Sequence, residues 1–135
     1  MSGAGLTEPA AVARPVILCA DDDPDILSLV SLRLERAGFE VVRVTDGDAA
    51  LEVLRARRPA VSVLDVMMPR QTGYEVLAAV RGDEATRYLK VILLSARVQK
   101  SDIALGIAAG ADAYLAKPFR SGELVALVRE LIEAG

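Results

Sequence analysis

Four short apolar runs of the chain each end in side chains that can bind a metal ion or a phosphoryl group. The groups at these ends are the carboxylates of Asp21, Asp22 and Asp23, the carboxylate of Asp65, the hydroxyl of Ser95 and the ammonium of Lys117. If the runs are neighbouring parallel strands, these ends share one edge of a sheet, where open α/β sheets bind ligands. Folding alone does not require so many carboxylates together, because like charges repel. A divalent cation or a bound anion would explain them.

Together these groups can support transfer of a phosphoryl group to a carboxylate. Oxygen ligands favour a hard cation, and two or three carboxylates with waters suit Mg²⁺. Asp22 and Asp65 can supply the metal site, and Asp65 is the natural nucleophile because it ends the central strand. Lys117 can supply a cation and Ser95 a hydrogen-bond donor to the phosphoryl oxygens. Asp23 precedes Pro24, so we interpret it as a helix N-cap rather than a ligand.

Strand-like and helix-like segments alternate five times along the chain. Apolar runs predict strands over residues 16–20, 40–44, 61–65, 91–95 and 113–117. Helices are predicted over residues 24–37, 46–57, from about 73 to 81, 101–109 and 121–134. The second strand alternates in polarity and suits a sheet edge, whereas the first, third and fourth are almost continuously apolar. The expected fold class is α/β, a (βα)5 doubly wound parallel sheet between two helical layers, and periodicity alone leaves the strand order open.

Length and composition limit the possible classes of protein. The chain of 135 residues is long enough for one domain, and no apolar stretch approaches the ~18 residues of a membrane span. Residues 1–14 lack a signal-peptide core, so we expect a disordered tail before a domain over 15–135, in the cytoplasm. The single Cys19 lies in an apolar run and is predicted to be buried.

The charges of the chain argue against direct nucleic-acid binding. Its net charge is −3, with acidic and basic residues interspersed. The basic cluster Arg55, Arg57 and Arg58 ends a predicted helix, where cations are favourable, and is interpreted as a solvated face. The sequence contains no histidine, which excludes Ser-His-Asp and Cys-His catalysis and histidine metal ligands. No glycine-rich phosphate-binding loop occurs, so nucleotide binding has no support.

Three segments resemble the signature segments of response-regulator receiver domains. They read ILCADDDP at 17–24, DVMMPRQTG at 65–73 and GADAYLAKPF at 110–119. The resemblance covers about residues 16–132 and implies the flavodoxin-like strand order 2-1-3-4-5. It implies a signalling module rather than an enzyme, with self-phosphorylation and slow autodephosphorylation as its only chemistry. A sensor histidine kinase or a phosphotransfer protein would be the phosphodonor, and a downstream effector or an output domain would respond, with a phosphorylation-dependent dimer as a further possibility.

The resemblance also implies a role for each matching residue. Asp65 would be the phosphoacceptor, and Mg²⁺ would be held by Asp22, Asp65, the backbone carbonyl of Met67 and, through a bound water, Asp21. The phosphoryl oxygens would be held by Ser95, the backbone of Ala96 and Lys117. Ser95 and Tyr114 would be the switch residues, and the Lys117–Pro118 peptide bond would be cis. Met67 and Arg97 would flank the path of the hydrolytic water, so we expect slow loss of the phosphoryl group.

The predicted helix over 24–37 carries more apolar residues than one core-facing stripe needs. The stripe consists of Ile26, Leu27, Val30, Leu34 and Ala37. Leu29 and Leu32 fall well outside this stripe, near the mouth of the acidic pocket. Scattered surface leucines are normal, but Leu29 and Leu32, with Ile26, also suit a docking surface for the kinase.

Two other functions stay open from the residues. Residues 21–23 fit the D-x-D motif of Mg²⁺-dependent phosphatases of the haloacid-dehalogenase type, which use an aspartate nucleophile. Pro24 and Asp25 replace the residues that this motif expects next, the chain has no cap domain, and the DVMMP segment would have no role. A degenerate receiver acting as a constitutive interaction domain is the third interpretation, against which the intact Asp22, Asp65, Ser95 and Lys117 argue.

Overall fold

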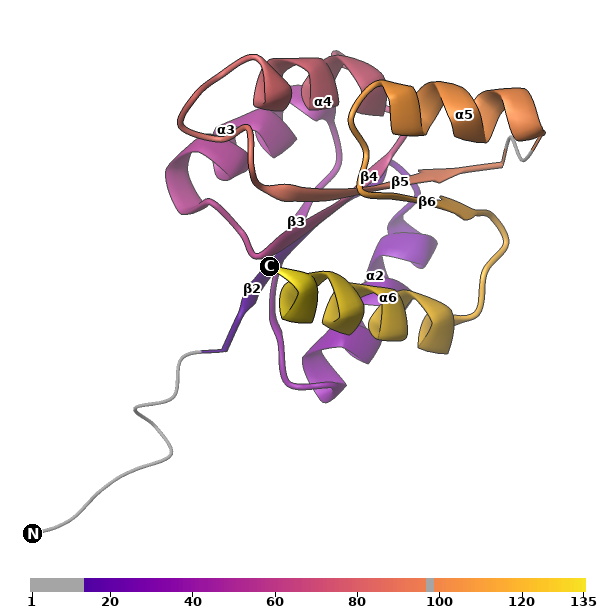
Figure 1. The fold of residues 1–135 in the computed structure, drawn as a ribbon. Coiled ribbons are helices and arrows are strands. Elements are labelled where there is room, and N and C mark those ends of the chain that lie inside the picture. Colours follow the sequence, from indigo (N-terminus) through magenta and orange to yellow (C-terminus); the bar gives the residue numbers. More distant parts are fainter. Residues whose placement is uncertain (1–13, 97–98) are drawn as a thin grey trace, which may run out of the picture.

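The chain folds around one sheet of five parallel strands. In a computed structural model, which describes residues 14–96 and 99–135, the strands are β2 (Val16–Ala20), β3 (Glu40–Val44), β4 (Val61–Asp65), β5 (Lys90–Ser95) and β6 (Ala113–Ala116). Their order in the sheet is β3-β2-β4-β5-β6 (Figure 1). All neighbouring pairs are parallel. The order 2-1-3-4-5 and the edge position of residues 40–44 are therefore confirmed.

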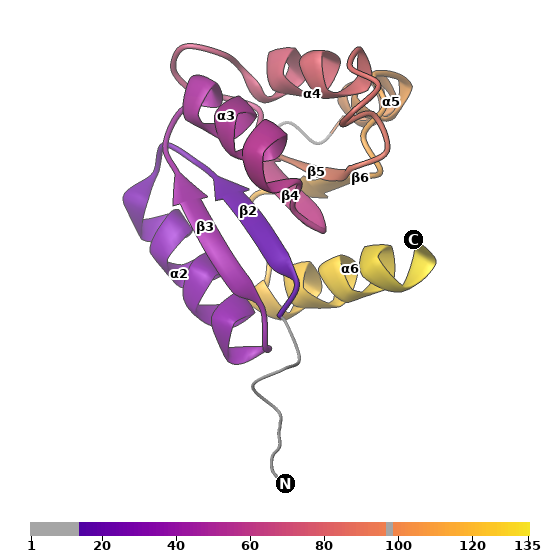
Figure 2. The same cartoon turned by 90° about the vertical axis from the view of Figure 1, so that its left-hand side faces the viewer.

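Five helices cover the two faces of this sheet. They are α2 (Pro24–Arg36), α3 (Gly47–Arg57), α4 (Gly73–Arg81), α5 (Lys100–Ala108) and α6 (Ser121–Ala134). Figures 1 and 2 show α2 and α6 on one face and α3, α4 and α5 on the other. Each helix follows a strand, and the first four return the chain to the next parallel strand, which gives the predicted three-layer arrangement. The predicted tail lies largely in residues 1–13, outside the described residues.

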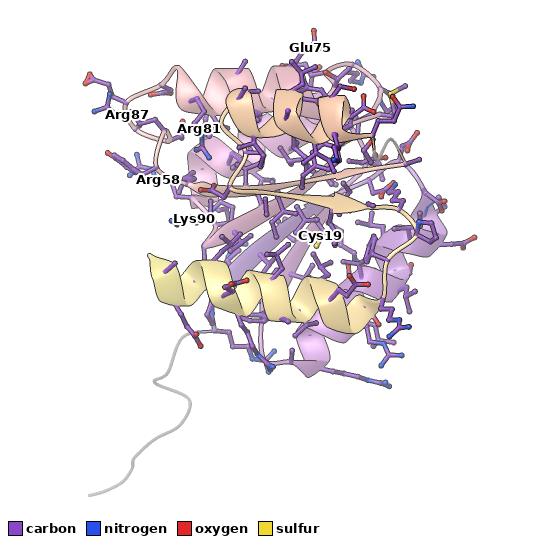
Figure 3. The ribbon with its side chains drawn as sticks, turned by 45° about the vertical axis from the view of Figure 1, so that its right-hand side comes forward. Cys19, Arg58, Glu75, Arg81, Arg87 and Lys90 are labelled. Atoms are coloured by element: carbon purple, nitrogen blue, oxygen red, sulfur yellow. The ribbon has the colours of Figure 1, made fainter. Side chains whose placement is uncertain are left out.

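The strands divide their side chains between two cores because successive residues point to opposite faces. Leu18, Leu64 and Leu93 join the core beneath α3 and α4. Ile17 and Cys19 join the core beneath α2 and α6. Cys19 is 2% exposed, as predicted, and burial raises the pKa of its thiol to about 12, with a smaller contribution from the charge of Asp21 (Figure 3). The strands are thus fixed from both sides, and their ends are placed with them.

The helix α2 is anchored where it leaves the site edge of the sheet. The Asp23 carboxylate accepts hydrogen bonds from the amides of Asp25, at 3.0 Å, and Ile26, at 3.4 Å, which confirms its role as N-cap. The buried residues of this helix are Leu27, Val30, Ser31 and Leu34. Ser31 thus belongs to the buried face and was not in the predicted stripe, whereas Ile26 and Ala37 are only half-buried.

No helix within the described ranges, 14–96 and 99–135, is long and apolar enough to cross a membrane.

Candidate functional site

Three carboxylates meet at the carboxyl ends of two neighbouring strands. Asp21 and Asp22 directly follow β2, and Asp65 ends β4. One carboxylate oxygen from each lies within 4.8 Å of the others. Asp21 and Asp65 are buried, whereas Asp22 is exposed. The predicted acidic cluster therefore exists, with one side open to solvent.

Lys117 reaches this cluster from the end of the outermost strand on the other side of β4. It follows β6, which is separated from β4 by β5. Its Nζ lies 2.9 Å from Oδ2 of Asp21 and 3.3 Å from Oδ2 of Asp65. The Lys117–Pro118 peptide bond is cis, as the resemblance implied. One ammonium thus bridges two buried carboxylates that come from different strands.

The charges within the cluster are not balanced. Burial and the nearby charge of Asp21 raise the pKa of Asp65 from 3.8 to about 6, although Lys117 and the Met67 amide favour the ionised form. Burial alone would lower the pKa of Lys117, but its hydrogen bond to Asp21 and the charges of Asp65 and Asp21 outweigh burial and raise it. A further cation beside Asp65 would relieve the repulsion between the carboxylates.

The donor set suits a hard divalent cation. All three converging side chains offer carboxylate oxygens, and Mg²⁺ is held in proteins by one or two carboxylates together with waters. Within the described residues the Asp22 carboxylate makes no hydrogen bond or ion pair, so it is available as a ligand. The cluster could therefore hold a metal ion at its open side.

Met67, two residues after Asp65 in the chain, also contributes to the site. The Met67 amide donates a hydrogen bond to Oδ1 of Asp65 at 3.2 Å. The Met67 side chain is 65% exposed. The other residue expected to tune hydrolysis, Arg97, lies outside the described residues, so the predicted obstruction of the water path is untested.

Ser95 and Tyr114 lie on the neighbouring strands β5 and β6. Ser95 is buried at the end of β5, beside the end of β4, where Leu94 is paired with Asp65. Its carbonyl accepts a hydrogen bond from the Lys117 amide at 2.8 Å. Tyr114 is half-buried, and its ring lies so close to Gly106 that a Cβ there would be 2.7 Å from a ring carbon. The switch roles of Ser95 and Tyr114, and the phosphoryl contact of Ala96, remain predictions.

An apolar groove of about 410 Å³ opens beside the cluster. It is lined by Ile26, Leu29 and Val30 of α2 together with Ala96, Lys117, Pro118, Phe119 and Ser121. Leu29 is 52% and Leu32 43% exposed, which confirms that both lie on the solvent side of α2. Ile26 is half-buried at the groove. Their use in docking stays a prediction.

Contacts around the loop after Asp65 were not identified from the sequence. Gln71 bonds to Asp48, and the Gly47 amide bonds to the carbonyl of Pro69. The glycine at the second position of the helix predicted over 46–57 is the sole sequence signal for these contacts, and it does not say which loop packs there.

Comparisons with known proteins agree with this geometry. The chain matches the family described as response regulator receiver domain over residues 17–129. It is 43% identical over 116 residues to the transcriptional regulatory protein CseB of Streptomyces avermitilis, covering 86% of this chain and 48% of CseB. The chain therefore spans about half the length of the curated relatives it matches.

Solved structures of receiver domains have the same fold as this chain. The receiver domain of Francisella response regulator 1452 has a TM-score of 0.85 and 32% identity, covering 90% of this chain and 98% of that one. The receiver domain of sensor histidine kinase PA1611 from Pseudomonas aeruginosa, solved with a magnesium ion coordinated in its active site cleft, has a TM-score of 0.82 and 29% identity, covering 90% and 99%. Response regulator receiver domains are signalling proteins rather than conventional enzymes. The family match, from the first strand of the sheet into its last helix, shows that this chain belongs to the response regulator receiver domains.

Proposed function

We propose that Asp65 accepts a phosphoryl group from a histidine kinase or a phosphotransfer protein, and that the phosphorylated domain signals to a partner. One observation carries this proposal. The buried Asp65 carboxylate lies between two other carboxylates and an ammonium 3.3 Å away, in a receiver fold. At neutral pH its pKa of about 6 leaves it mostly ionised, so it can act as a nucleophile.

Asp22, Asp65 and the backbone carbonyl of Met67 would hold Mg²⁺, with Asp21 acting through a bound water. When bound, the ion would neutralise negative charge on the phosphoryl group during its transfer. Support comes from the open acidic cluster, and from the magnesium ion in the receiver domain of PA1611. A bound cation would also reduce the electrostatic repulsion between the carboxylates of Asp65 and Asp21.

The other side of the phosphoryl group would be held by Lys117, Ser95 and the amide of Ala96. Lys117 already bridges Asp21 and Asp65, so it is placed to exchange the Asp65 oxygen for a phosphoryl oxygen. Ser95 ends the strand next to Asp65 and offers a hydroxyl donor. With Tyr114, Ser95 would then carry the change of state from the site to the surface.

Labelling by a small phosphodonor tests this proposal. With acetyl phosphate and Mg²⁺, the intact chain should gain one phosphoryl group, detected by mass spectrometry, and EDTA should prevent it. Asp65→Asn should abolish labelling, whereas Asp25→Asn, at an exposed carboxylate of the first turn of α2, should label normally. Labelling that persists in Asp65→Asn, or without a divalent ion, would contradict the proposal.

Neither alternative function is favoured by the findings. The match over residues 17–129 is to a signalling family rather than to a phosphatase. A degenerate receiver would not need the unbalanced cluster of Asp21, Asp22 and Asp65. Sustained hydrolysis of a phosphatase substrate, in place of single labelling, would restore the enzyme interpretation.

The phosphodonor is proposed to dock on Ile26, Leu29 and Leu32. The groove lined by Ile26 and Leu29 also contains Lys117, so a helix seated there would lie beside the phosphorylation site. Leu29→Glu or Leu32→Glu should impair transfer from the kinase while acetyl phosphate still labels the protein. Normal transfer in both variants would contradict this docking surface.

The response is proposed to pass to an effector protein or an output domain, with dimerisation on phosphorylation as one route. CseB is a transcriptional regulatory protein about twice the length of the matched region. The net charge of −3 makes direct nucleic-acid binding by this domain itself unfavourable. Slow loss of the phosphoryl group, expected from Met67 and Arg97, should become faster when these are replaced by Asn and Glu.

A further inference from the structure

The loop that follows Asp65, which we call the phosphoacceptor loop (residues 66–72), is closed at its base. The Gly73 amide donates a hydrogen bond to the carbonyl of Val66 at 3.0 Å. A Cβ at Gly73 would lie 2.6 Å from the carbonyl oxygen of Asp65, so the start of α4 is pressed against the backbone of Asp65. The base of the loop therefore cannot shift without moving Asp65 itself.

The tip of the phosphoacceptor loop is held by the first residues of α3. The Gly47 amide donates to the carbonyl of Pro69 at 3.2 Å, and Nε2 of Gln71 donates to Oδ1 of Asp48 at 2.8 Å. Nε of Arg70 lies 3.7 Å from Oδ2 of Asp46, the N-cap of α3. The N-cap of α3 and the first two residues of the helix thus contact three successive residues of the loop, 69–71.

The closest of these contacts leaves no space for a side chain. A Cβ at Gly47 would collide with the carbonyl oxygen of Gln71 and lie 2.5 Å from its Cβ. The helix α3 cannot easily move away, because its own residues Ala50, Leu51 and Leu54 are buried in the core. Its N-terminus is also fixed, since the Asp46 carboxylate accepts a hydrogen bond from the Ala49 amide. A side chain at position 47 would therefore displace the loop rather than the helix.

Displacement of the tip would reach the site through Met67. Met67 lies two residues before Pro69, and its amide donates to the Asp65 carboxylate. From these contacts we infer that Gly47 and Asp48 are positioning residues that fix the Met67 peptide, whose amide donates to Asp65 and whose carbonyl would be a ligand of Mg²⁺. The inference rests on the proposed function, because that function gives the Met67 carbonyl its role as a ligand. It assigns control of metal affinity to a helix that contributes no residue to the acidic cluster.

Magnesium binding to the full chain tests this inference without phosphorylation. Calorimetric titration with Mg²⁺ should show binding about tenfold weaker in Gly47→Ala, as when partners that orient metal ligands are lost. The Met67 amide resonance should also shift in the metal-free variant. Gly122→Ala is the matched control, because Gly122 also lies in the first turn of a helix but has open space where its Cβ would be. It should bind Mg²⁺ within about twofold of the original chain.

The exposed hydrogen bond at the tip gives a milder second test. Asp48→Ala and Gln71→Ala should each weaken Mg²⁺ binding about threefold, equivalent to a typical net hydrogen bond. Asp48→Asn keeps an acceptor oxygen and should restore normal binding. These variants also decide the question if Gly47→Ala does not fold, because both positions lie at the surface.

The outcomes separate this inference from the proposed function. If the original chain binds Mg²⁺ but takes no phosphoryl group on Asp65, the proposed function fails. The positioning role of Gly47 and Asp48 is then still decided by the Mg²⁺ affinity of their variants. If Gly47→Ala and Asp48→Ala bind Mg²⁺ normally, with an unmoved Met67 resonance and only a lower melting temperature, Gly47 and Asp48 are packing residues and the inference is overturned.

Discussion

Two clusters of charged groups lie at opposite ends of the same sheet, and they are built differently. At the carboxyl ends of the strands, the three carboxylates of Asp21, Asp22 and Asp65 meet a single ammonium, that of Lys117, which pairs with Asp21 and Asp65 but not with Asp22. At the amino ends of β5 and β6, Arg81, which is labelled in Figure 3, is paired with Asp112 at 2.9 Å. The first cluster has an excess of negative charge, whereas the second is balanced one to one.

The balanced cluster also has several short hydrogen bonds within the protein. Arg81 donates to the carbonyls of Gly110, Arg87 and Leu89 as well as to Asp112, at 2.7 to 2.9 Å. Asp112 Oδ2 additionally accepts the amide of Val91, the second residue of β5, at 2.8 Å. Such a cluster stabilises the fold and needs no ligand. The difference teaches that unbalanced charge and an unpartnered carboxylate mark a binding site, whereas charge alone does not.

Removal of the balanced cluster should have the largest effect on stability. Arg81→Ala leaves three carbonyls without this donor and Asp112 without its counter-ion. We expect the free energy of unfolding, measured with urea, to fall by about 2 to 4 kcal/mol. Mg²⁺ affinity at low temperature should be unchanged. The exposed Arg87→Ala is the control, and a loss for Arg81→Ala no larger than in this control would break the comparison.

The unbalanced cluster should instead respond to metal. At a Mg²⁺ concentration about 100 times its dissociation constant, the free energy of unfolding should rise by about 2.7 kcal/mol. Asp22→Asn should remove most of this gain, because Asp22 is the available carboxylate, while Arg81→Ala should keep it. If Mg²⁺ raised the free energy of unfolding equally in Asp22→Asn and Arg81→Ala, the acidic cluster would not be the metal site, and the two ends of the sheet would not differ in this way.

Without metal, the carboxylate of Asp65 should oppose folding at neutral pH. Its pKa is raised from 3.8 to about 6, so the folded state disfavours the ionised form. The penalty begins as the pH rises above about 4 and is complete above about 6. Asp65→Asn in EDTA should therefore be more stable at pH 7.5 by about 1 to 3 kcal/mol, because the full shift of roughly two pKa units corresponds to about 3 kcal/mol at most. The advantage should shrink towards pH 4, and thermal melts at both pH values measure it. An Asn variant less stable than the original at pH 7.5 would contradict the repulsion.

Between the two ends, β4 carries an uncharged polar group whose replacement should have the smallest effect. The Ser62 hydroxyl is buried and has no hydrogen-bond partner among the described residues. Ser62→Ala should raise the free energy of unfolding by about 0.5 kcal/mol, because an unsatisfied hydroxyl is removed. Thr86→Val is the matched control, since the Thr86 hydroxyl is buried but donates to the carbonyl of Val80 at 2.9 Å. Thr86→Val should be destabilising. If Ser62→Ala lost as much stability, the Ser62 hydroxyl would have to make a hydrogen bond in the folded protein, which would contradict the prediction.

The carboxyl end of the sheet could be predicted from the sequence because its signals are local. The strands that carry the site residues are apolar runs, and a residue at or just after the end of such a run, such as Asp65 or Lys117, must lie at the shared edge. Asp23 was predicted as a cap because Pro24 follows it. The signature segments supplied the strand order, which periodicity could not.

The amino end could not be predicted in this way. Arg81 and Asp112 are 31 residues apart, and each is an ordinary surface residue type in its own segment. The burial of Ser31 depends on how α2 is rotated against the sheet, and a serine carries no apolar signal. Contacts of Gly47 with Gln71 depend similarly on how two helices and a loop meet in space.

The burial of Cys19 also makes the domain convenient for attaching probes. Cys19 is the single cysteine of the chain, and its thiol stays protonated and inaccessible at neutral pH. A cysteine introduced on the surface, for example at Arg87 or Leu105, would therefore be the one reactive thiol in the folded protein. A fluorophore or spin label at position 105 could then report movements of α5 without first replacing Cys19.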